Sequence, residues 1–153
     1  MRVAITGGTG FVGRHLAERL GPEASVVVSR RTGVALDDVD ALTAAFAGCD
    51  AVAHCAGINR EIGDQTFQGV HVEGTRAVVS ATGTRRLVHV SSLSAREPQL
   101  SMYGWSKREA ETIVAESASD WTIVRPTGVY GPGDTEIRDM FRLARLGLAF
   151  LPP

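Results

Sequence analysis

The stretch that decides the fold lies near the start of the chain, at residues 5–22, and reads ITGGTGFVGRHLAERLGP. The apolar run Val3–Ile5 meets its glycines abruptly, as a buried parallel strand does. Apolar residues from Phe11 to Leu20 then recur at helical spacing, and Gly21-Pro22 supplies the expected helix stop. A strand, a glycine-rich turn and a helix are therefore predicted in immediate succession.

The glycine-rich turn predicts an anion-binding site. Glycines let the backbone approach a ligand closely, and the helix N-terminus offers unpaired N–H groups and the positive end of its dipole. Residues 8–13 match the spacing G-x-G-x-x-G, while Gly7, Gly10 and Gly13 match G-x-x-G-x-x-G. Because the turn follows a strand and opens a helix, we expect it to bind the pyrophosphate of a dinucleotide.

The end of the second expected strand, Ser25–Ser29, bears on which dinucleotide binds. Sites that take NAD usually carry an acidic residue there, which bonds the ribose hydroxyls. This chain instead has Ser29, followed by Arg30 and Arg31. Arginines can hold a 2′-phosphate by charge-assisted hydrogen bonds, so NADP is favoured over NAD. The alternative is a pair of solvated surface arginines.

The remainder of the chain alternates strands with helices. A short third strand is expected at residues 34–36, and further strands at 51–54, 87–90 and 122–124. A helix capped by Asp37 or Asp38 ends at Gly48, and others are expected at 70–81, at 102–116, and around Ile137, Met140, Phe141 and Ala144. This alternation predicts an α/β fold, with a parallel sheet covered on both faces.

Composition excludes several function classes. The chain has 153 residues and a formal net charge of -1, so no global field attracts nucleic acid or an anionic membrane. No apolar run approaches the roughly 18 residues that a membrane span needs. Cys49 and Cys55 lack the spacing of a zinc site or a disulfide framework. We therefore expect one globular, cytoplasmic domain that binds a small-molecule substrate, with no metal, nucleic-acid or membrane partner.

A candidate catalytic pair lies in the helix expected at 102–116. Tyr103 and Lys107 are four residues apart and share one helix face. A nearby ammonium stabilises phenolate, so the phenol can exchange a proton with a substrate oxygen nearer neutral pH. The pair follows a strand that runs into Ser91-Ser92, and ligands of parallel sheets bind beyond the carboxyl ends of strands. A solvated lysine on a surface helix is the alternative interpretation.

Five motifs, in this order, resemble those of the extended and atypical short-chain dehydrogenases/reductases, and specifically the NAD(P)-dependent epimerase/dehydratase group. They are TGGTGFVG at 6–13, HCAG at 54–57, VSS at 90–92, the Tyr103–Lys107 pair, and RPTGVYGPG at 125–133. The resemblance covers nearly the whole chain. It implies that residues 1–153 form an NAD(P)-binding Rossmann domain, with a doubly wound parallel sheet in three α/β/α layers.

The resemblance also implies a role for individual residues. Ser92 would hold the substrate oxygen, Tyr103 would transfer the proton, and Lys107 would also bond the nicotinamide ribose. With the two arginines, the expected cofactor-binding residues are Gly7, Gly10, Phe11, Val12, Arg30, Arg31, Leu36, Ala56, Gly57, Lys107, Pro126 and Val129.

Three positions depart from the family pattern. Val34-Ala35-Leu36 stands where the family often has Gly-Asp-Leu, so a carboxylate contact to adenine is missing, although Leu36 can still supply backbone contacts. His71 replaces an asparagine, and it either takes over that role or is structural or solvated. Leu93 follows Ser92 in place of the Asp-Glu pair typical of nucleotide-sugar dehydratases, which disfavours that activity.

Members of this group are commonly longer, because a second half supplies the substrate-binding domain. The chain ends at Phe150-Leu151-Pro152-Pro153, so we expect the N-terminal part of a longer protein, without its substrate domain. The leading hypothesis is an NAD(P)-dependent oxidoreductase or epimerase that acts by hydride transfer on a carbonyl, an alcohol or a nucleotide sugar. The alternative is a non-catalytic NADP(H)-binding sensor or accessory subunit. A weaker hypothesis is a homodimer formed through the helices at 70–81 and 102–116.

Overall fold

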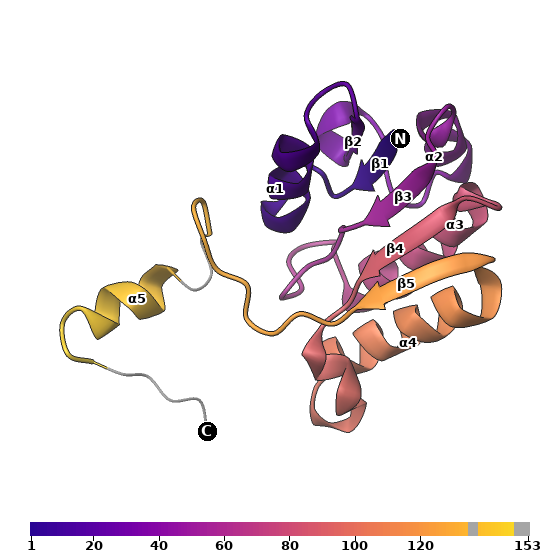
Figure 1. Ribbon diagram of the computed structural model, residues 1–153. Coiled ribbons are helices and arrows are strands. Elements are labelled where there is room, and N and C mark those ends of the chain that lie inside the picture. The colour runs from indigo at the N-terminus through magenta and orange to yellow at the C-terminus, as the bar shows by residue number, and fades with distance from the viewer. Residues whose placement is uncertain (135–137, 149–153) are drawn as a thin grey trace.

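A five-stranded parallel sheet forms the centre of the molecule in the computed structural model, which describes residues 1–134 and 138–148 (Figure 1). The strand order is β2-β1-β3-β4-β5. The strands are β1 (Val3–Thr6), β2 (Ser25–Val28), β3 (Ala51–His54), β4 (Arg86–Val90) and β5 (Asp120–Val124). The chain runs outward from β1 in both directions, so a crevice opens beyond the carboxyl ends of β1 and β3, where ligands bind in such sheets.

Helices cover the two faces of the sheet. They are α1 (Phe11–Leu20), α2 (Val39–Phe46), α3 (Gly74–Thr82) and α4 (Met102–Ser117); a further helix, α5 (Arg138–Ala144), follows β5. Figure 1 shows α1 on one face and α2, α3 and α4 on the other. The predicted doubly wound, three-layer Rossmann-type fold is therefore confirmed. Helix α5 stands away from the sheet, at the end of the segment that leaves β5 (Figure 1).

The core divides into two clusters because successive side chains of a strand point to opposite faces. All four residues of β1 and all four of β3 are buried, as the apolar run Val3–Ile5 predicted for β1. On the α1 face, Val3, Ile5, Ala51 and Ala53 pack against Leu16, Ala17 and Leu20. On the other face, Ala4, Val52 and Leu87 pack with Leu42, Phe46, Val78 and Val114.

The prediction of a short strand at residues 34–36 is wrong. After β2 the chain enters a tight 3-10 turn, Arg30–Thr32, which Ser29 and Thr32 close by reciprocal hydrogen bonds. Gly33 follows at φ 85°, in the left-handed region. The turn directs Val34 and Leu36 into the core, where both pack against the cluster under α2 and α3. These apolar residues cover the core instead of adding a sixth strand.

The helix expected at 70–81 begins earlier and in a different conformation. A π-helical segment, Gln68–Glu73, precedes α3, and the Gly74 N–H bonds the carbonyl of Gly69, five residues back. The wider turn buries His71 and Val72. Other expectations agree with the structure: Asp38 caps α2 by accepting from the Ala41 N–H at 2.9 Å. For the last helix, Ile137 and the side chain of Met140 lie outside the described residues.

Close backbone packing fixes the glycine-rich turn. Gly7 has φ 67°, and a Cβ there would lie 2.6 Å from Ala56 Cα. A Cβ on Gly13, inside α1, would clash with the carbonyl oxygen of Gly7. The turn, the start of α1 and the segment after β3 therefore pack backbone to backbone.

We expect Gly13→Ala to lower the free energy of unfolding by about 1–3 kcal/mol, because the methyl group overpacks the turn. In an uncrowded helix the same change stabilises by about 1 kcal/mol, so a gain in urea unfolding experiments would contradict this account. Gly48→Ala is the control, since its φ is 71° but no atom lies within 4 Å of the new Cβ. Conformational strain alone, about 1–2 kcal/mol, is expected there.

Candidate active site

A cavity of about 820 Å³ lies at the carboxyl ends of the strands, and this volume suits a small-molecule site. Its walls come from the turns after β1, β3, β4 and β5 and from the start of α4. Most of the predicted site residues line it: Gly7, Gly10, Phe11, Val12, Ala56, Gly57, Ser92, Tyr103, Lys107, Pro126 and Val129. The structure thus brings together residues from Gly7 to Val129, because parallel strands end at one edge.

Three predicted residues lie outside this cavity. Arg30 and Arg31 are exposed in the turn after β2, next to the strand end but not in the cavity wall. Leu36 is half-buried, and its Cδ1 would lie 3.2 Å from a Cβ placed on Gly74. Its side chain therefore faces the start of α3.

The N-terminus of α1 opens onto the cavity. Gly10 is the N-cap residue and offers no side-chain hydrogen bond, while Gly10, Phe11 and Val12 all line the cavity. Uncapped N–H groups and the positive end of the helix dipole attract anions. The close packing of Gly7 and Gly13 keeps side chains out of this corner, so the backbone there fits the pyrophosphate of a dinucleotide.

Tyr103 lies in the first turn of α4. Ser101 caps this helix by accepting from the Gly104 N–H at 3.0 Å. The half-buried Tyr103 ring makes edge-to-face contacts with the ring of Phe67, at a centroid distance of 5.8 Å, and with that of His71, at 5.6 Å. These contacts restrict the ring while it lines the cavity.

Lys107 lies one helical turn after Tyr103 and is only 4% exposed. Its Nζ donates to the carbonyl oxygen of Val90 at 2.8 Å. Burial lowers the pKa of Lys107 to about 8, although the nearby Glu111 carboxylate opposes this shift. The side chain is therefore still mainly a cation at neutral pH, but it releases its proton more readily than a surface lysine.

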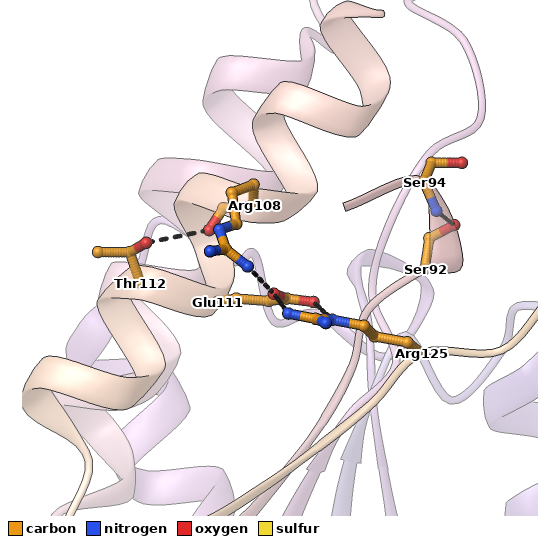
Figure 2. Close-up of polar contacts among 6 residues, drawn as sticks. All are labelled: Ser92, Ser94, Arg108, Glu111, Thr112 and Arg125. Atoms are coloured by element: carbon orange, nitrogen blue, oxygen red, sulfur yellow. Dashed lines mark hydrogen bonds and ion pairs between the residues drawn. The ribbon is translucent and has the colours of Figure 1, made fainter. Parts of the chain in front are cut away.

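Ser92 follows β4 and caps a short 3-10 turn. Its Oγ accepts from the Ser94 N–H at 3.2 Å (Figure 2), so the hydroxyl hydrogen remains able to donate. The Leu93 N–H donates to the carbonyl oxygen of Pro126 at 2.9 Å. The Ser92 turn is thereby joined to the segment after β5, which also lines the cavity.

An ion pair between the exposed Arg125 and the buried Glu111 connects α4 to the end of β5 (Figure 2). Arg125 donates to both carboxylate oxygens of Glu111, at 2.8 and 2.6 Å. Glu111 is 4% exposed, and burial alone would raise its pKa. The hydrogen bonds and charge of Arg125 outweigh that effect and hold the pKa of Glu111 below its ordinary value. The pair fixes the residue directly before Pro126.

Sequence reasoning assigned no role to Glu111 or Arg125. Spacing could have indicated Glu111, because Tyr103, Lys107 and Glu111 are each four residues apart and so share one helix face. A second missed contact joins α1 to the segment after β5, where the Pro132 carbonyl oxygen lies 3.2 Å from Arg14 Nη2 and 2.9 Å from His15 Nε2. No local pattern indicates that contact.

Two buried histidines lie on the adjacent strands β3 and β4. His54 makes hydrogen bonds with Thr6 Oγ1 at 2.6 Å and Thr75 Oγ1 at 3.0 Å. His89 is 1% exposed, and neither of its ring nitrogens has a hydrogen-bond partner among the described residues. Burial lowers the pKa of His54 to about 3 and that of His89 well below its ordinary value. Both rings are therefore neutral in the folded chain at neutral pH.

This burial predicts loss of stability in acid. Below pH 6.5 the unfolded chain binds protons that the folded chain excludes, so the free energy of unfolding falls as pH drops from 6.5 toward 3. The loss is at most about 1.4 kcal/mol per pH unit for each histidine. His89→Leu should retain or raise the free energy of unfolding at pH 7, because no hydrogen bond is lost. Its free energy of unfolding should then fall less steeply with decreasing pH, because one fewer histidine takes up a proton on unfolding. Urea unfolding at pH 7, 6 and 5 measures both effects; equal slopes for the two proteins would contradict this assignment.

Among residues 1–134 and 138–148, no group of three or more His, Cys, Asp and Glu side chains is placed to hold a metal ion. Nor is any helix of that part of the chain both long and apolar enough to cross a membrane.

A doubly wound parallel sheet with its cavity at the reversal of strand order defines a Rossmann-type domain. Residues 3–146 match the NAD dependent epimerase/dehydratase family. The chain therefore belongs to this family, which confirms the resemblance carried by the five sequence motifs.

Individual relatives agree with this assignment. The chain is 38% identical over 160 residues to the ceramide reductase of Caulobacter vibrioides, an alignment that covers 93% of this chain and 50% of the reductase. The dTDP-4-dehydrorhamnose reductase of Bacillus anthracis, solved in complex with NADP, superposes with a TM-score of 0.74 at 24% identity, over 95% of this chain and 60% of that one. The UDP-glucuronic acid 4-epimerase of Bacillus cereus, solved in complex with NAD, superposes with a TM-score of 0.73 at 21% identity. The match covers 95% of this chain and 64% of that one. The two structures support the fold, and the chain spans about half the length of the ceramide reductase.

Proposed function

We propose that this chain is the cofactor-binding and catalytic part of a nicotinamide-dinucleotide-dependent oxidoreductase that acts on a carbonyl or alcohol. One observation carries the proposal: the glycine-rich turn, the uncapped N-terminus of α1, and Ser92, Tyr103 and Lys107 all line one cavity. Residues 1–153 would form an NAD(P)-binding domain in the N-terminal part of a longer protein. The half-length match to the ceramide reductase supports that arrangement.

The cavity fits the two ends of such a cofactor. The turn at Gly7 and the start of α1 would hold the pyrophosphate, while Lys107, Pro126 and Val129 would lie along the nicotinamide end. When bound, the cofactor supplies a hydride to the substrate carbon or accepts one from it.

Two side chains of the protein would act on the substrate oxygen, and a third would act on one of these two. Ser92 donates its free hydroxyl hydrogen to that oxygen and holds it in place. Tyr103 transfers a proton to the oxygen during reduction and removes one during oxidation. The buried ammonium of Lys107 stabilises the phenolate that remains on Tyr103. All three residues line the cavity, which supports these roles.

Reduction of an uncharged carbonyl compound is favoured over the epimerisation of a nucleotide sugar. Lys107 is the only lysine or arginine among the described residues of the cavity wall, and it already donates to Val90. Leu93 and Leu100, in the same wall, are 42% and 77% exposed. Apart from the backbone at the start of α1, this surface offers apolar contact and little charge for the diphosphate of a substrate. The relative at 38% identity, named a ceramide reductase, supports reduction as well.

The competing proposal is a non-catalytic NADP(H)-binding sensor or accessory subunit. A protein that only binds the dinucleotide does not need a serine, a tyrosine and a buried lysine in one cavity wall, so their meeting supports catalysis. The expected homodimer stays a prediction; in this chain the buried faces of α3 and α4 pack on the sheet.

Tyr103→Phe should abolish turnover and change the affinity for the cofactor by less than about threefold, because it removes one hydroxyl that acts on the substrate. Steady-state kinetics and nicotinamide fluorescence titrations measure the two effects separately. Tyr130→Phe is the matched control, since Tyr130 is 68% exposed and outside the cavity wall. An equal loss of turnover and cofactor binding in Tyr103→Phe would contradict the proposed role.

Preference for NADP rests on Arg30 and Arg31, which follow β2 where an acidic residue would favour NAD. Ser29 at the strand end is engaged with the Thr32 N–H. The double variant Arg30→Ala, Arg31→Ala should weaken the binding of NADPH at least about tenfold and leave the binding of NADH nearly unchanged, since charge-assisted bonds to the 2′-phosphate are lost. Arg19→Ala, an exposed change at the far end of α1, is the control. Matched losses for the two cofactors would remove the basis for this preference.

A further inference from the structure

His71 occupies a central position that the catalytic proposal does not use. It lies in the π-helical segment Gln68–Glu73, is 2% exposed, and lines the cavity. Such widened turns are often found at functional sites, because they re-aim one side chain. Here the turn directs an imidazole between the segment after β3 and the first turns of α4.

Both ring nitrogens of His71 have hydrogen-bond partners. Nε2 lies 3.0 Å from the N–H of Ile58, and Nδ1 lies 2.9 Å from Ser106 Oγ. The Ser106 hydroxyl in turn donates to the carbonyl oxygen of Tyr103 at 2.9 Å. A continuous chain of three hydrogen bonds therefore runs from the Ile58 backbone to the Tyr103 backbone.

The direction of these hydrogen bonds determines which ring nitrogen of His71 carries the proton. A backbone N–H can only donate, so Nε2 must accept and carries no hydrogen. A neutral imidazole then has its hydrogen on Nδ1, which donates to Ser106 Oγ. Burial and the positive charge of Lys107 lower the pKa of His71 to about 3, which agrees with a neutral ring.

Packing connects the same imidazole to the Tyr103 side chain. The His71 ring stacks on that of Phe67 at a centroid distance of 5.5 Å and meets the Tyr103 ring edge to face at 5.6 Å. On its other side, a Cβ on Gly57 would lie 3.3 Å from His71 Nε2. The imidazole thus fills the space between the turn at Gly57-Ile58 and the phenol.

We propose that His71, as the neutral form with its hydrogen on Nδ1, is a positioning residue that holds the cofactor-facing turn at Gly57-Ile58 and the Tyr103 ring in one fixed arrangement. This inference rests on the proposed catalytic role of Tyr103. His71 touches no reacting atom; it acts through Ile58, Ser106 and the Tyr103 ring. An asparagine or glutamine side chain has the same pairing of one acceptor and one donor, so His71 does with a ring what an amide can do with its oxygen and nitrogen.

Nuclear magnetic resonance tests the arrangement without cofactor or substrate. Long-range ¹H–¹⁵N correlations of the ¹⁵N-labelled chain at pH 7 should show His71 with a protonated Nδ1 and a bare Nε2, with the assignment made by loss of the signals in His71→Leu. Nuclear Overhauser contacts between the Tyr103 and Phe67 rings should be present in the parent chain. We expect them to be lost in His71→Leu and retained in His71→Gln.

His89→Leu is the matched control, because it also removes a buried imidazole but no hydrogen bond. It should retain the Tyr103–Phe67 contacts and the turnover of the parent chain. In turnover assays, His71→Leu should lower kcat about tenfold and His71→Gln less than about threefold, since a misplaced catalytic group loses rate steeply.

Three results would overturn the inference: a hydrogen on Nε2, ring contacts that persist in His71→Leu, or the same loss in His89→Leu as in His71→Leu. If the parent chain binds neither NADPH nor NADH, the proposed function fails. The tautomer and the ring contacts would still decide whether His71 positions Tyr103.

Discussion

The whole site depends on a steric constraint: the turn after β1 must lie against the backbone that follows β3. Gly7 meets Ala56 at a distance that leaves no space for a Cβ, and Gly13 meets the Gly7 carbonyl in the same way. This approach sets where α1 begins and exposes its uncapped N–H groups to the cavity. Because the strands of the sheet are parallel, their terminal residues reach the same edge.

Much of the fold could be predicted because buried parallel strands are short runs of mainly apolar residues. Residues 51–54 and 87–90, which are apolar apart from one histidine each, are strands. The same rule failed at residues 34–36, since three apolar residues can equally cover a core. The turn at Arg30–Gly33 decided between the two outcomes, and its reciprocal side-chain bonds involve only Ser29 and Thr32. The π-helical segment was also unpredictable, because one extra residue in one turn leaves no periodic pattern.

The residues of the candidate site also fall into two groups, those that the sequence predicts and those that only the structure shows. Glycines, Ser92, Tyr103 and Lys107 could be identified from sequence because their chemistry depends on local spacing or on the end of a strand. Arg125 with Glu111, and His71 with Ile58, depend on partners 13 or 14 residues away, on different elements of the fold. Their side-chain types are compatible with surface or core positions, so only the folded arrangement shows that Glu111 and His71 are buried and that each residue is paired.

Helix α4 carries Tyr103, Lys107 and Glu111 at intervals of four residues, and each interval corresponds to slightly more than one turn. The phenol, the amine and the carboxylate consequently lie on one face of the helix. Removal or insertion of a single residue between 103 and 111 would rotate one part of this series by about 100° relative to the other. In homologous chains, length variation should therefore be tolerated in the turns at 93–101 and beyond residue 117, while the interval from 103 to 111 should keep a constant length.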